Sequence, residues 1–133
     1  MNKKEHIKYW TTSAKHDFKT AETLFKQKKY DWCLFIGHLV LEKTLKALYV
    51  KNSLDNSIPP KTHNLLKLAE LAKIVPDEET KLYLLNFNDF NIEVRYPDYN
   101  LFFYKKCSKK FTEENFKKIK EIYQWLIKLT QKE

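Results

Sequence analysis

One arginine stands out among the basic residues of this sequence. Lysine and arginine together number 25, yet only Arg95 carries a guanidinium group. That planar group can hold a phosphate through two parallel hydrogen bonds, which the ammonium group of a lysine cannot do. Asp89, Glu93 and Asp98 lie close to it in the sequence, so an internal ion pair that fixes the end of a helix is an equally good interpretation. Phosphate binding and ion pairing therefore both stay open.

Two tyrosines beside this arginine add a second kind of contact. Tyr96 and Tyr99 offer flat aromatic faces of the type on which bases stack in proteins that bind single-stranded nucleic acids. The other interpretation is ordinary packing around Pro97. If the arginine binds phosphate, the tyrosines extend the hypothesis to a nucleotide or RNA ligand.

Glu42 and Lys46 are a second charged pair with a suggestive spacing. They stand four residues apart, in the order in which an acid and a base stabilise an exposed helix by a few tenths of a kcal/mol. The simple interpretation is therefore a surface pair. However, the segment around it, residues 31–52, has apolar side chains on most sides of the expected helix. Little solvent-facing surface is left there for such a pair.

The four histidines differ in their surroundings. His38 lies on a stripe of leucines between residues 34 and 48, which predicts a core histidine hydrogen-bonded to a neighbour rather than a catalytic one. His63 stands at the expected start of a helix, where it can cap the helix or bind an anion together with free backbone amides, and capping is the simpler interpretation. His6 and His16 are expected to be solvated.

Several kinds of chemistry lack the residues they need. No set of His, Cys and carboxylates has the spacing of a metal site, and a chain whose only glycine is Gly37 cannot form a Gly-rich phosphate loop. No Ser-His-Asp arrangement is indicated. Cys33 and Cys107 have neither redox nor metal spacing, and Cys33 is expected to be a small buried thiol. We therefore expect no metal, no cofactor and a cytoplasmic location.

The net charge of +8 is unevenly distributed. Residues 1–29 hold eight lysines and three acids, residues 105–133 hold nine and four, and residues 30–104 hold eight basic and ten acidic residues, so the three segments carry +5, +5 and −2. A basic face of this kind can attract RNA or DNA phosphates, although lysines on solvated helix faces are an ordinary alternative. No stretch is apolar enough to span a membrane, and no signal peptide is recognisable.

Periodic apolar residues predict long helices. Glycine and proline are scarce, which leaves few turns for a β-sandwich or barrel, and Leu, Lys, Glu and Ala favour helix. We expect one domain over residues 1–133 with an all-α fold, an antiparallel up-and-down bundle of about five helices. Residues 97–110 are expected to be irregular and to include the apolar patch Leu101–Tyr104. The helices are expected over residues 5–27 and 31–52, from about Thr62 to Pro76, from Asp77 to about Arg95, and onward from a cap at Thr112-Glu113-Glu114.

Three short motifs occur in an order that resembles a known family. They are Glu42-Lys43-Thr44-Leu45-Lys46-Ala47-Leu48, then Thr62-His63-Asn64-Leu65, then Arg95-Tyr96-Pro97-Asp98. Together they resemble HEPN domains of the kind found beside minimal nucleotidyltransferases in bacteria and archaea, and the resemblance spans about residues 6–130. It implies a four-helix-bundle-like fold and binding of nucleotides or RNA. It also implies that Lys46 points into a cleft near Arg95 and that Glu42 orients it.

The resemblance therefore implies a set of ligand-binding residues, and it also shows a departure. The set is Arg95, Tyr96, Asp98, Lys46, Glu42 and His63. Some branches of the family are metal-independent ribonuclease toxins that have a histidine four to six residues after the arginine, where it handles the proton of the 2′-hydroxyl. No histidine follows Arg95 at that spacing here. The inherited mechanism thus lacks its principal proton carrier.

Three functions are compatible with these observations. The first is a non-catalytic module that binds a nucleotide or RNA and forms a homodimer, with a nucleotidyltransferase as a possible protein partner. The second is a ribonuclease toxin that uses His38 or His63 together with Arg95, and the third is a bundle that serves only in protein assembly. The homodimer is expected because residues 31–52 are apolar on three sides and Leu101–Tyr104 lacks an obvious cover. The catalytic residues stay unassigned.

Overall fold

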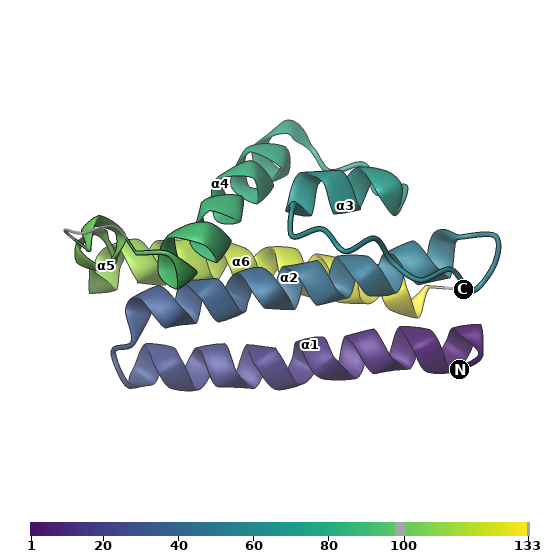
Figure 1. Ribbon diagram of the computed structural model, residues 1–133, viewed down its shortest axis with the longest axis horizontal. Coiled ribbons are helices and arrows are strands. Elements are labelled where there is room, and N and C mark those ends of the chain that lie inside the picture. The colour runs from purple at the N-terminus through teal and green to yellow at the C-terminus, as the bar shows by residue number, and fades with distance from the viewer. Residues whose placement is uncertain (98–100, 133) are drawn as a thin grey trace.

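The computed structural model describes residues 1–97 and 101–132 of the chain, and in those ranges it contains six helices and no strand. The helices are α1 (Lys3–Lys26), α2 (Tyr30–Asn52), α3 (Leu65–Leu71), α4 (Glu78–Arg95), α5 (Phe102–Lys106) and α6 (Lys109–Gln131). Figure 1 shows that the four long helices, α1, α2, α4 and α6, alternate in direction along the chain, and that α4 is tilted across α2. The prediction of an all-α, up-and-down bundle is confirmed. None of the described helices combines the length and the apolarity that crossing a membrane requires.

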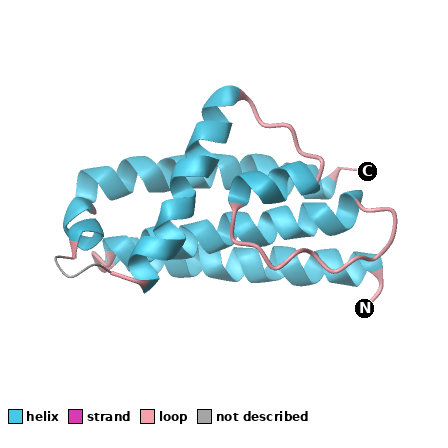
Figure 2. Ribbon diagram, turned by 45° about the horizontal axis from the view of Figure 1, so that its top comes forward, coloured by secondary structure: helices cyan, strands magenta, loops and turns pink. Residues whose placement is uncertain are grey.

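Helix α2 is the centre of the fold. It packs against α1, α3, α4 and α6, and Figure 2 shows α3 and α4 lying over the long helices. Thirteen of its 23 residues are buried, because apolar side chains occupy most of its circumference. The apolar circumference of α2 is therefore explained by its central position within one chain. The case for a dimer then depends on other surfaces.

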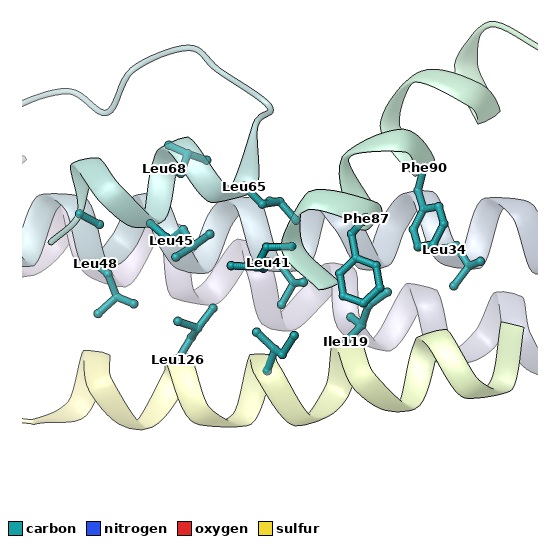
Figure 3. Close-up of a cluster of buried hydrophobic side chains, with 14 of the residues drawn as sticks. Leu34, Leu41, Leu45, Leu48, Leu65, Leu68, Phe87, Phe90, Ile119 and Leu126 are labelled. Atoms are coloured by element: carbon teal, nitrogen blue, oxygen red, sulfur yellow. The ribbon is translucent and has the colours of Figure 1, made fainter. Parts of the chain in front are cut away.

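The core joins α2 to α3, α4 and α6. Figure 3 shows leucines of α2 meeting side chains from all three neighbours. Gly37 lets α6 approach closely, since a Cβ at that position would lie 2.9 Å from Cδ1 of Ile119, inside the 3.5–4.0 Å at which carbon atoms pack best. Close packing of α6 thus accounts for a glycine in the middle of α2. The labelled core residues are Leu34, Leu41, Leu45, Leu48, Leu65, Leu68, Phe87, Phe90, Ile119 and Leu126.

The segment after α4 differs from the prediction. Residues 102–106 form the short helix α5, whereas the sequence suggested irregular structure from 97 to 110. Helix α6 begins at Lys109, and its cap is Ser108, whose Oγ accepts the amide hydrogen of Phe111 at 3.1 Å. The predicted cap at Thr112 is wrong, because that residue lies one turn inside the helix and is fully buried. The helix therefore starts about one turn before the predicted cap, and Phe111 in this first turn packs against the core.

Hydrogen bonds join the amino-terminal residues to the loop that follows α2. Lys3 Nζ donates to the carbonyl oxygen of Ser53 at 2.6 Å, and His6 Nδ1 lies 2.8 Å from Oδ1 of Asn56. His6 is therefore buried, with 8 % of its surface exposed, and the prediction of a solvated His6 is wrong. The loop covers it, which a sequence pattern within α1 cannot reveal. His16 is exposed as predicted.

Both cysteines are buried. Cys33 was predicted to be a small buried thiol, and it is fully buried on α2. Burial raises the pKa of Cys33 and of Cys107 to about 12. Because the thiolate is the reactive form, both side chains are inert at neutral pH.

Candidate functional site

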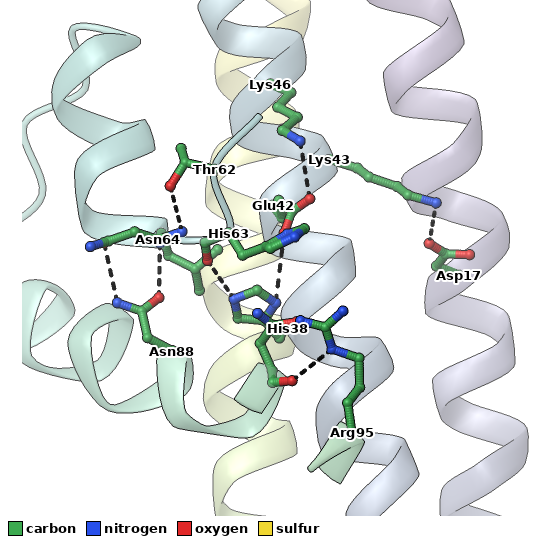
Figure 4. Close-up of polar contacts among 12 residues, drawn as sticks. Asp17, His38, Glu42, Lys43, Lys46, Thr62, His63, Asn64, Asn88 and Arg95 are labelled. Atoms are coloured by element: carbon green, nitrogen blue, oxygen red, sulfur yellow. Dashed lines mark hydrogen bonds and ion pairs between the residues drawn. The ribbon is translucent and has the colours of Figure 1, made fainter. Parts of the chain in front are cut away.

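Glu42 is the centre of a buried polar cluster on α2. Its Oε2 accepts a hydrogen bond from Lys46 Nζ at 3.1 Å, and its Oε1 accepts one from His63 Nδ1 at 2.8 Å. Only 4 % of Glu42 and 8 % of Lys46 is exposed, so this is a buried ion pair and the surface interpretation is wrong. Figure 4 shows both partners converging on the carboxylate. We call Glu42, Lys46, His63 and His38 the Glu42 cluster.

His38 lies one turn before Glu42 and is completely buried. Its Nε2 donates to the carbonyl oxygen of His63 at 2.8 Å, which confirms the prediction of a core histidine bonded to a neighbour. Burial lowers the pKa of His38 to about 4, although the carboxylate of Glu42, 3.9 Å from Nδ1, opposes that shift. The ring is therefore neutral at pH 7. It holds the backbone of His63 in place and carries no charge.

His63 is held by its neighbours and does not cap α3. Asn64 is the cap, since its Oδ1 accepts the amide hydrogen of Lys67 at 3.1 Å. Asn88 on α4 accepts the amide hydrogen of Leu65 at 2.9 Å. These two amides are thereby occupied, and the interpretation of His63 as the cap of α3 is wrong. What remains is the half-exposed ring of His63, fixed on one edge by Glu42.

Arg95 ends α4 next to the Glu42 cluster. Its Nε donates to the carbonyl oxygen of Asn91, one turn earlier, at 3.0 Å. Its guanidinium carbon lies 6.0 Å from the ring of Phe35, and Figure 4 shows the side chain beside His38. Its positive charge also helps to lower the pKa of His38. The structure thus brings Arg95 beside His38 from a different helix, whereas a cleft shared by Lys46 and Arg95 stays a prediction.

Of the residues predicted after Arg95, only Tyr96 can be placed relative to the site. The ring of Tyr96 lies 5.4 Å from the guanidinium carbon of Arg95 and is largely exposed. Tyr96 also lines a hollow of about 280 Å³ that it shares with Trp32, Pro97 and residues 101–104. Asp98 and Tyr99, both predicted near the site, lie outside the described residues. The ion pair of Arg95 with Asp89, Glu93 or Asp98 therefore stays a prediction.

The electrostatic balance of this region favours an anion. Glu42 is the acid of the cluster, and Lys46 and His63 already occupy both of its oxygens. Arg95 adds a positive charge at the exposed side of the cluster. A phosphate placed beside Arg95 would meet the N–H donors of the guanidinium group and a positive field. The arrangement suits phosphate binding and also offers one histidine at which a proton can be exchanged.

Sequence reasoning missed three parts of this site. It did not foresee that His38 holds the backbone of His63, that Asn88 fixes the start of α3, or that Asn91 holds Arg95. The contacts of His38 and Asn88 join segments more than 20 residues apart in the chain. The Asn91 contact is local, and the spacing of four residues within one helix was a signal that could have found it.

Comparison with known proteins gives one match. The model of a family described as the HEPN domain matches residues 7–130. The match includes the whole Glu42 cluster and Arg95. No similar protein was found among curated proteins or solved structures.

Proposed function

Because the chain belongs to the HEPN domain family, we propose that it is a nucleotide- or RNA-binding module whose phosphate site is built around Arg95. The observation that carries the proposal is the position of the only arginine. Arg95 stands at the exposed end of α4, beside a cluster whose acid already has two partners. An added phosphate therefore has a guanidinium group to bind and no unpaired carboxylate of that cluster to oppose it.

Each residue of the proposed site has a role. Arg95 binds the phosphate through its outer nitrogens, because Nε is used by Asn91. His63 presents its exposed edge to the same phosphate, and Glu42 fixes the orientation of that ring. Lys46 adds positive charge from its buried position beside Glu42. Tyr96 stacks on the base. Asp98 belongs to the proposed set through the sequence motif Arg95-Tyr96-Pro97-Asp98 alone.

We expect Arg95→Ala to weaken binding of a short RNA by about 1.5–3 kcal/mol, the range for hydrogen bonds to a charged group. Arg95→Lys should restore only part of this loss, because the charge returns without the planar fork. Calorimetric titration with a hexanucleotide measures both effects. Thermal melts should be nearly unchanged, since Arg95 lies at an exposed helix end.

Lys67→Ala is the matched control for Arg95→Ala, because Lys67 is also an exposed cation but lies on α3. It should bind the hexanucleotide like the parent chain. A large drop in the melting temperature of Arg95→Ala without a selective binding defect would instead indicate a structural ion pair. Full binding by a stable Arg95→Ala variant would contradict both interpretations.

The contact between Glu42 and His63 supports a second candidate function, a metal-independent ribonuclease. A carboxylate that accepts from Nδ1 leaves Nε2 of the imidazole to take a proton. In such a reaction the 2′-hydroxyl gives its proton to His63 and attacks the adjacent phosphorus. The 5′ oxygen leaves with a proton from the solvent, and a 2′,3′-cyclic phosphate forms. His63 would thus replace the histidine that does not follow Arg95.

The two functions differ in what happens to bound RNA. For the binding module we expect a labelled 20-nucleotide RNA to stay intact during hours of incubation with micromolar protein. Cleavage to 2′,3′-cyclic ends that His63→Ala abolishes would favour the ribonuclease. His16→Ala, which removes an exposed histidine of α1, is the control for trace contamination.

We also propose that the module forms a homodimer through α4 and α5. Apolar side chains on the outer face of α4 and on α5 are more than half exposed, among them Leu82, Leu85, Ile92, Phe102 and Tyr104. Exposed apolar surface of this kind is typical of protein interfaces. Light scattering at micromolar concentration should give about twice the chain mass of 16.1 kDa. Leu85→Glu combined with Ile92→Glu should return the mass to that of one chain, and a monomeric parent protein would contradict the proposal.

A minimal nucleotidyltransferase is the protein partner that we propose from the family resemblance. The motifs at Glu42, His63 and Arg95 resemble those of HEPN domains found beside such enzymes. A partner of this kind would bring a nucleotide to the Arg95 site. A neighbouring reading frame for a small nucleotidyltransferase would support this proposal.

A further inference from the structure

Five of the six lysines of α1 lie on one face of that helix. They follow one another at intervals of four, seven, four and seven residues. On an α-helix these intervals keep the side chains within an arc of about 60° and spread them over about 33 Å. All five are exposed, and within the described part of the chain none forms an ion pair. We call Lys4, Lys8, Lys15, Lys19 and Lys26 the lysine stripe.

The lysine stripe faces away from the Glu42 cluster. The side of α1 nearest that cluster is marked by Asp17, whose Oδ2 lies 2.6 Å from Lys43 Nζ, and by Ser13, which accepts from the same nitrogen at 2.8 Å. Figure 4 shows this contact between α1 and α2. Lys15 and Lys19 are each two residues from Asp17, so they point to the opposite side of the helix. The stripe and the Arg95 site are thus separate surfaces.

A groove runs beside the lysine stripe, between α1 and α6. Its volume is about 530 Å³, and its charged lining is Lys15 and Lys19 together with one acid, Glu22. Its apolar lining includes Phe18 and Tyr123, whose rings stack at 5.0 Å and 24°, together with Ile127. A row of positive charges therefore borders an aromatic groove. Proteins that bind single-stranded nucleic acids combine these two features.

We propose that the lysine stripe is a second nucleic-acid surface, which holds the phosphates of a single-stranded RNA along α1 and directs its bases toward the α1–α6 groove. Lysine ammonium groups suit this task, because they attract phosphate without demanding one geometry. Each contacted phosphate releases counterions, so several weak contacts add to a useful and salt-sensitive affinity. The stripe would bind a strand without reading its sequence.

The groove fits RNA better than an acidic partner helix. A docking helix needs a broad exposed apolar floor for its own apolar face. Phe18, Tyr123 and Ile127 are only partly exposed, and the two aromatic rings cover each other. The exposed part of this face is mainly positive charge, which suits a polyanion.

The inference goes beyond the proposed function. The Arg95 site can bind a single nucleotide, whereas the lysine stripe requires a ligand long enough to meet several lysines. It also stands independently, because no stripe lysine is part of the Arg95 site. Substitution in the stripe therefore tests one surface, and Arg95→Ala tests the other.

The experiment measures binding of a fluorescent 20-nucleotide oligouridine by anisotropy over a range of salt concentrations. For the triple variant Lys8→Gln, Lys15→Gln, Lys19→Gln we expect affinity at least about tenfold lower at 100 mM salt and a salt slope about two smaller, since single strands contribute about 0.7 per phosphate contact. The matched control removes the same charge from exposed lysines elsewhere, at Lys67, Lys73 and Lys105. It should bind within about twofold of the parent chain.

Each other outcome has a defined meaning. Equal weakening by both triple variants would show a general effect of net charge and overturn the proposal, as would no effect of the stripe variant in protein with a normal melting curve. A polyglutamate peptide that competes as well as RNA of equal charge would make the occupant an acidic protein segment and overturn it too. DNA of the same length binding as well as RNA would support it, because the stripe contacts phosphates alone. Loss in the stripe variant with full binding by Arg95→Ala would uphold the stripe and reject the Arg95 site.

Discussion

Between pH 7 and pH 4 the protein is expected to lose about 3 kcal/mol of its free energy of unfolding through His38 alone. Burial lowers the pKa of this histidine from 6.5 to about 4. Below pH 6.5 the unfolded chain binds a proton that the folded chain does not, so stability falls as the pH drops. Below about pH 4 the ring is protonated in both states and this loss ends. The two pKa values differ by about 2.5, which corresponds to about 3 kcal/mol.

Urea unfolding at pH 7, 5.5 and 4 measures this loss. The charged or titratable groups that face the ring are Glu42, His63 and Arg95, so the variant must isolate His38 from them. His38→Gln keeps a donor for the carbonyl oxygen of His63 and should flatten the pH dependence over this range. His16→Gln, at an exposed site on α1, should keep the full dependence. An identical pH dependence in the parent chain and His38→Gln would show that other groups cause the acid instability.

The long helices were predicted well because their apolar residues repeat at helical spacing. Each long helix carries apolar residues at steps of three and four over many turns, and this period is visible without knowledge of the neighbours. Helix α5 has five residues, too few to show a period, and its apolar run Leu101–Tyr104 fits several structures. The start of α6 was misjudged for a related reason. Ser108 and Thr112 are both good caps, and only the packing of Phe111 decides between them.

The sequence identified the residues of the candidate site better than it predicted the contacts between them. The spacing of Glu42 and Lys46 gives their contact directly, because four residues make about one helical turn. The contact of His63 with Glu42 depends on how residues 53–64 cross the face of α2, which no local pattern encodes. Burial of Lys46 depends in the same way on elements far along the chain. Helical spacing therefore predicts the contact between Glu42 and Lys46, whereas tertiary packing determines which residues surround them.

Glu42→Ala is expected to cost about 3–5 kcal/mol of stability, the usual result of removing one partner of a buried ion pair. The ammonium group of Lys46 would stay buried without its carboxylate, and the ring of His63 would lose the contact that orients it. Glu42→Gln should cost less, because the amide oxygen still accepts one of the two hydrogen bonds. Urea unfolding at pH 7 measures both variants. Glu113→Ala, which removes an exposed acid from α6, should change stability by less than about 0.5 kcal/mol.

The double variant Glu42→Leu, Lys46→Leu separates the loss of a charge from the loss of a contact. Removing both charges leaves no unpaired ion, so this variant should regain most of the stability that Glu42→Ala loses. It should still bind RNA less well, because His63 is no longer held beside the Arg95 site. Stability within about 1 kcal/mol of the parent chain for Glu42→Ala would mean that Lys46 reaches solvent and that the pair acts as a surface pair. Normal RNA binding by the double variant would show that Arg95 acts without the orientation that Glu42 gives to His63.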